Sequence, residues 1–201
     1  MKRLAFSDDM MRAISLGFKS MTRRPEKRAT PDAKGRMFWK YCPSDALGFP
    51  APSIRWDDNS VHLRPCHRFN DLVAATCAYF PAQVGCSTSY RFKHISVHPH
   101  AKIGWKSSRI MPAALAPFVL RITSVRAERL GEITDEDAVR EGMMHWGTRT
   151  LVTIGPHAPR DVFGIYWNRL YGARPLVDAW TRDRDNWVWV YGFEIEERRI
   201  G

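Results

Sequence analysis

Residues 19–24, KSMTRR, bring an amine, two hydroxyls and two guanidinium groups into six positions. A threonine hydroxyl is a weak nucleophile that needs a base beside it. A lysine can be that base when burial or neighbouring cations lower its pKa. Lys19 and Thr22 would form such a polar site if they meet on one side of an exposed turn. The alternative is that Lys19, Arg23 and Arg24 only complement the negative C-terminus of a preceding helix.

One carboxylate, Glu141, stands at an unfavourable place in the sequence. Residues 134–137, TDED, have the spacing of a capping box with Asp in place of Glu, and Gly142 ends the short helix that they begin. Glu141 then falls in the last turn, where the helix dipole is already negative. A surface glutamate is the ordinary interpretation, but the misfit also points to a cationic partner elsewhere in the chain.

Residues 104–112, GWKSSRIMP, combine cations with an aromatic ring. A segment of this composition suits a phosphate or a stacked base. Trp105 and Arg109 are therefore candidate ligand contacts.

These candidates must be positioned by a mixture of strands and helices. Ser7 and Gly17 have the residue types of a helix N-cap and of a C-terminal glycine, so a helix is predicted between them, after a short strand at residues 4–6. No element is predicted at residues 43–65. The other predicted elements are strands at 36–41, 90–97, 117–130 and 187–195, a short helix at 69–79, and a helix at 162–171 whose aromatic face is expected in the core. This order suggests a small twisted β-barrel decorated with helices.

Charge is unevenly distributed along the chain. Residues 1–126 hold 21 Lys and Arg against 8 Asp and Glu, whereas residues 127–201 hold 10 against 13. A strongly basic region indicates a polyanionic partner, of which nucleic acid is the leading candidate. The alternative is a basic protein that has no such partner.

The sequence predicts a cytoplasmic protein that does not enter a membrane. The apolar run after Arg3 is too short for a signal peptide, and the uncharged residues 72–90 are interrupted by Pro81, Gln83 and Gly85. The four cysteines include no C-x-x-C pair, which favours reduced thiols.

No metal and no cofactor are expected. Structural zinc ligands usually come in pairs that are two to four residues apart. The pairs nearest to that spacing are His62 with Cys66 and His94 with His98, and both match poorly.

Three segments carry a resemblance to a known family. The first, FSDDMMRAISLGFKSMTRR, is similar to a helix that ends in Gly-x-Lys-x-x-Thr-x-Arg. The second runs through SSRIMP and ITSVRAERLGEITDEDAVREGM, and the third joins residues 163–167 to NWVWVYGFEIE. Together they resemble the ASCH domains of the PUA-like superfamily, above all the longer members from phages and prophages. Residues 45–100 depart from those relatives, which usually carry a Gly-Asp turn and a Leu-Trp-Val-Arg-Glu strand there.

The resemblance implies a fold and a site. The fold would be α+β, a PUA-like small twisted β-barrel decorated with short helices, in a single domain over residues 1–201 with a divergent insertion at about 43–104. Small bacterial ASCH proteins include amidohydrolases that remove the acetyl group from N4-acetylcytidine with a lysine, a threonine three residues later and a distant glutamate. That pattern falls on Lys19 as base, Thr22 as nucleophile and Glu141 as the group that orients the lysine or handles the proton of the leaving amine. The weaker candidates for substrate contact are Arg23, Arg109 and Trp105.

Two kinds of function remain open from the sequence. The first is a hydrolase acting on an acylated pyrimidine nucleoside, for which the Lys19 ammonium should lie within hydrogen-bond reach of both Thr22 and Glu141. The second is a non-catalytic module that binds RNA or a modified base, which the basic residues and tryptophans fit equally well. In either case the expected partner is a modified nucleoside or a nucleic acid.

Overall fold

The computed structural model describes residues 1–26, 39–42, 53–56, 62–63, 65–84, 87–92, 104–150, 158–171, 180 and 185–199. Its strands are β1 (Lys2–Ala5), β2 (Met21–Pro25), β3 (Trp39–Cys42), β4 (Ser53–Trp56), β5 (His62–Leu63), β6 (Leu72–Thr76), β7 (Tyr79–Val84), β8 (Ser87–Phe92), β9 (Phe118–Arg129) and β10 (Trp187–Arg198). Its helices are α1 (Asp8–Ser15), α2 (Asp135–Arg140), α3 (Met143–Thr150) and α4 (Pro159–Tyr171), with short 3-10 turns η2 (Ser108–Ile110), η3 (Ala113–Leu115) and η4 (Leu130–Glu132).

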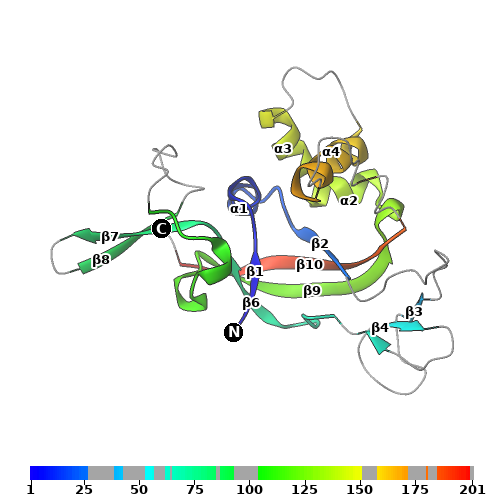
Figure 1. The fold of residues 1–201 in the computed structure, drawn as a ribbon, viewed down its shortest axis with the longest axis horizontal. Coiled ribbons are helices and arrows are strands. Elements are labelled where there is room, and N and C mark those ends of the chain that lie inside the picture. The colour runs from blue at the N-terminus through cyan, green and yellow to red at the C-terminus, as the bar shows by residue number, and fades with distance from the viewer. Residues whose placement is uncertain are drawn as a thin grey trace.

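A mixed five-stranded sheet organises this α+β fold. The strand order is β1-β6-β9-β10-β2, in which β1 runs parallel to β6 and the other neighbours are antiparallel. The α-helices gather on one side of the sheet, where α2, α3 and α4 pack against one another (Figure 1). The hairpin β7–β8 projects from one end of the molecule, and β3 and β4 lie beyond the other end.

The long strands β9 and β10 form the centre of the core. They pair from Arg129 with Trp187 at one end to Phe118 with Arg198 at the other. Every residue from Trp187 to Phe193 is buried, although a half-covered strand would alternate. Residues on both faces of β10 are therefore covered, as in strands that lie between two layers.

The predicted α+β class is confirmed, but the described strands of the main sheet do not close into a barrel. The two edge strands, β1 and β2, do not pair through a backbone ladder. They are joined instead by a side chain, because Arg24 Nη2 on β2 donates a 2.6 Å hydrogen bond to the carbonyl of Ala5 on β1. The sheet therefore curls far enough to bring its edges together but leaves a seam between them.

The helix predicted at residues 69–79 is also wrong, because these residues form β6 and begin β7. Asn70 has a φ of 63°, in the left-handed region that asparagine tolerates, and its N–H donates to the carbonyl of Ile122 on β9. The apolar run that follows is buried between β1 and β9, and a short apolar run has no period that separates a strand from a helix. Residues 72–76, which fall within the span expected to be a divergent insertion, therefore form a strand of the main sheet.

The other predicted elements are found with shifted ends. The first helix, the long strand after residue 117, the short helix after Thr134, the aromatic helix and the terminal strand are all present. The strand predicted at 36–41 is β3, and the one predicted at 90–97 overlaps β8; residues 36–38 and 93–97 lie outside the described residues. Strands β4 and β5 occur where no element was predicted. Within the described residues, no helix is long and apolar enough to cross a membrane.

Candidate active site

Lys19 is positioned by the end of α1. Ser7 caps the start of this helix, where its hydroxyl accepts from the N–H of Met10. At the other end Gly17 adopts a φ of 79°, and the N–H of Phe18 donates to the carbonyl of Ala13. With the Gly17 N–H bonded to Ile14, these contacts make the Schellman ending that a glycine permits. The chain is thereby turned, two residues before Lys19, towards the end of α2.

Glu141 is positioned by a similar ending on α2. It is the C-cap of that helix, and Gly142 follows with a φ of 86°. A Cβ on Gly142 would lie 3.2 Å from Cβ of both Ala13 and Lys19, so the two helix ends are in direct contact. The N–H of Ser20 donates to the carbonyl of Arg140, which joins them further. Both glycines thus allow the lysine and the carboxylate to meet.

The Lys19 ammonium and Glu141 form a buried ion pair. Nζ donates to Glu141 Oε2 at 2.7 Å and to the backbone carbonyl of Glu141 at 2.8 Å. The two side chains are only 2% and 3% exposed. The cationic partner that the misplaced glutamate suggested is therefore Lys19.

The buried position changes the acidity of Lys19. Burial lowers its pKa below the ordinary value of 10.5, the ion pair with Glu141 opposes that shift, and the neighbouring Arg24 and Arg23 guanidinium groups add to it. The direction is the one that a lysine acting as a base requires, because a lower pKa makes the neutral amine more accessible.

Arg23 holds Glu141 from the other side. Its Nη1 donates to Glu141 Oε1 at 3.3 Å and to the sulfur of Met21 at 3.6 Å. Its Nε and Nη2 donate to Glu128 Oε1 at 2.8 and 2.6 Å, and Nη2 also donates to Asp137 Oδ2 at 2.6 Å. All five N–H donors of a guanidinium are thereby engaged. Arg23 is therefore committed to these carboxylates and orients Glu141.

Thr22 lies in β2, opposite Tyr191 of β10, and is buried. The expected exposed turn is therefore wrong, because both Lys19 and Thr22 are buried and Thr22 belongs to a strand. No hydrogen bond joins Lys19 to Thr22. Of the two contacts expected for the Lys19 ammonium, the one with Glu141 is present and the one with Thr22 is absent. Both side chains nevertheless line the same cavity.

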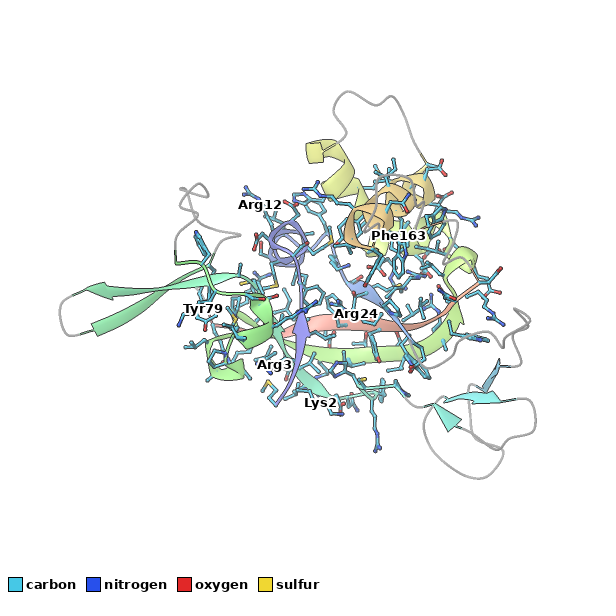
Figure 2. All side chains as sticks on the ribbon, in the orientation of Figure 1. Lys2, Arg3, Arg12, Arg24, Tyr79 and Phe163 are labelled. Atoms are coloured by element: carbon cyan, nitrogen blue, oxygen red, sulfur yellow. The ribbon has the colours of Figure 1, made fainter. Side chains whose placement is uncertain are left out.

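A cavity of about 340 Å³ opens at the seam between β1 and β2. Five of the six residues singled out in the sequence line it: Lys19, Thr22, Glu141, Arg23 and Arg109. Trp105 is not among the lining residues. Figure 2 shows Arg24 beside β1 and Phe163 on α4. The volume is within the range of small-molecule sites.

The aromatic wall of this cavity was not predicted from the sequence. It comes from α4 and consists of Phe163, Tyr166, Trp167 and Tyr171. Tyr166 OH lies 3.5 Å from Ser7 Oγ, and burial raises its pKa to about 12, so it remains a neutral phenol. The aromatic spacing predicted a core helix, and Phe163, Tyr166 and Trp167 do belong to the core. Periodicity alone carries no signal that one side of such a helix also faces a ligand.

The described residues include no cluster of three His, Cys, Asp or Glu side chains that could hold a metal ion. Glu141, which lines the cavity, and the Arg23 partners Glu128 and Asp137 are already paired with Lys19, Arg23 and Arg126. Among the cysteines, Cys66 is exposed and Cys77 is buried, and both are free thiols. His94 and His98, one of the two pairs considered for zinc, lie outside the described residues.

The sequence matches no protein-family model and no curated protein. Among solved structures, the chain is similar to one described as an ASCH domain from Lactobacillus crispatus JV V101. The two share 14% sequence identity with a TM-score of 0.32, and the match covers 91% of this chain and 67% of that chain.

Proposed function

We propose that this protein is an ASCH-type amidohydrolase that removes an acyl group from a modified pyrimidine nucleoside such as N4-acetylcytidine. Thr22 is the nucleophile, Lys19 the base, and Glu141 the group that orients Lys19. The observation that carries the proposal is their convergence: three polar side chains, from the connection between α1 and β2, from β2 and from the end of α2, line one cavity with an aromatic wall. An aromatic wall suits a planar base.

The buried charges support a proton-transfer role for Lys19. Glu141 contacts two cations, Lys19 through Oε2 and Arg23 through Oε1. When Lys19 is neutral, Glu141 therefore keeps a positively charged partner. This arrangement lets Lys19 lose and regain a proton without leaving an unpaired buried carboxylate.

The proposed reaction has two halves. In the first, Thr22 Oγ bonds to the acyl carbon while neutral Lys19 takes the hydroxyl proton. The bond from that carbon to N4 then breaks, and the proton passes from Lys19 to the leaving nitrogen. In the second half, a water molecule gives a proton to Lys19 while the water oxygen attacks the acyl carbon of the Thr22 ester. The carboxylic acid leaves, and the proton on Lys19 returns to Thr22.

A non-catalytic module that binds RNA or a modified base is the second candidate. It is favoured by the absence of a hydrogen bond between Lys19 and Thr22, since both contacts of the Lys19 ammonium go to Glu141. In such a module the same cavity would hold a base, and the ion pair would be structural.

Release of cytidine from N4-acetylcytidine, followed by chromatography, separates the two candidates. Wild type should hydrolyse the substrate, whereas Thr22→Val and Lys19→Met should lose turnover. Ser20→Ala is the matched control, because it removes a hydroxyl from the same segment outside the cavity lining. Thermal melts check that each variant folds. No turnover of any N4-acylated cytidine by wild type would favour the binding module, and undiminished turnover in Thr22→Val would exclude Thr22 as nucleophile.

A further inference from the structure

The cavity lining carries more positive charge than its own carboxylate balances. Four cations, Lys19, Arg23, Arg24 and Arg109, line it together with one carboxylate, Glu141. Lys19 is paired with Glu141, and Arg23 is neutralised mainly by two carboxylates that lie outside the lining. Two arginines, Arg24 and Arg109, are left without a carboxylate partner among the described residues.

Arg24 is held in place but incompletely satisfied. Its Nη2 donates to the Ala5 carbonyl, and its guanidinium carbon lies 5.2 Å from the centre of the Phe6 ring. Its Nε is buried and has no hydrogen-bond partner among the described residues. A buried donor without an acceptor is costly, and Arg24 lines the cavity. An acceptor oxygen on a bound ligand would satisfy this donor.

Arg109 lies at the exposed part of the same lining. It belongs to η2, whose first turn is capped by the hydroxyl of Ser107. Arg3 on β1 donates to the carbonyl of Met111, which fixes the segment that carries Arg109 against the main sheet. The Arg109 side chain has no acceptor among the described residues, so it is available to a ligand that enters the cavity.

We propose that the cavity binds its substrate more tightly as a nucleotide, in which phosphate oxygens pair with Arg109 and Arg24, than as the neutral nucleoside. This inference rests on the proposed function for the identity of the base. A neutral nucleoside would leave both arginines without a counter-charge, whereas an anionic phosphate supplies one. Arginine is well suited to phosphate through its forked donors. The phosphate is either a terminal monoester or a diester within a chain.

Calorimetric binding to the wild-type protein tests this without requiring turnover. The probes are cytidine, cytidine 5′-monophosphate and a cytidine trinucleotide. At least one phosphorylated probe should bind about tenfold or more tightly than cytidine, as expected for charge-assisted hydrogen bonds, and the preference should shrink with added salt. Arg109→Gln should lose most of the preference. Arg12→Gln, which removes an exposed arginine of α1 outside the lining, should keep the preference.

The outcomes separate this inference from the proposed function. A preference for the monophosphate assigns a mononucleotide, and a preference confined to the trinucleotide assigns a diester. Equal binding of all three probes, no binding of any, or an unchanged preference in Arg109→Gln would overturn the inference. Phosphate-dependent binding without hydrolysis of any acylated cytidine would uphold it and remove the hydrolase proposal.

Discussion

Replacing Arg23 by glutamine should destabilise the protein strongly, although Arg23 is not assigned to the reacting atoms. Its side chain is 1% exposed and contacts Glu128, Asp137 and Glu141. Removing one partner of a buried ion pair typically costs about 3–5 kcal/mol, because the remaining charges stay buried and unpaired. Arg126 and Lys19 still neutralise part of the cluster, so we expect the lower half of that range.

A thermal melt measures this effect directly. In a protein of this size each kcal/mol shifts Tm by about 2–4 °C, so Arg23→Gln should lower Tm by about 6–16 °C. Arg121→Gln is the matched control, because it removes the exposed ion pair with Glu196 and should leave Tm nearly unchanged. Arg23→Lys should fall between them, since it keeps the charge but cannot reach all three carboxylates. If Arg23→Gln had the same Tm as Arg121→Gln, the buried ion pairs of Arg23 would not stabilise the protein as expected from their burial.

Two further predictions follow from the site. The rate of hydrolysis should rise with pH through the pKa of Lys19, with a midpoint below 10.5, because only the neutral amine accepts the Thr22 proton. A rate of hydrolysis that falls with pH across the neutral and alkaline range would contradict the role of Lys19 as base. Gly142→Ala should reduce turnover and Tm together, because the left-handed φ of 86° strains alanine and its Cβ would press on Lys19 at 3.2 Å. Gly17→Ala is the control for backbone strain alone, since a Cβ at residue 17 meets nothing within 4 Å. This variant should lower Tm and should affect turnover less than Gly142→Ala does.

The positions of Lys19 and Glu141 could be predicted because their signals are local. Gly17 and Gly142 mark helix ends in the sequence, and both adopt the left-handed conformation. The carboxylate at a helix C-terminus pointed to a cationic partner, and its partners in the structure are Lys19 and Arg23. Only the family resemblance placed Lys19 and Glu141 in one site. The burial of both residues could not be predicted from the sequence, because it depends on how the two helix ends pack against each other.

Other parts of the site depend on contacts between distant residues. Arg23 reaches Glu128 and Asp137 across 105 and 114 positions of the chain, and no local pattern links them. The aromatic residues of α4 have the spacing of a core helix, and that spacing is the same whether a residue faces other side chains or a cavity. Likewise β6 was mistaken for a helix because its apolar run is short and buried on both sides.

The proposed mechanism requires Thr22 to form a covalent bond to the acyl group during turnover. Wild-type protein would be mixed with N4-acetylcytidine, quenched in acid during the first turnovers, digested and examined by mass spectrometry. If Thr22 is the nucleophile, the peptide containing Thr22 should gain the mass of one acetyl group, and fragmentation should place that group on Thr22. Thr22→Val should show neither the adduct nor turnover. Acetylcytidine hydrolysis that persists in Thr22→Val would contradict the claim.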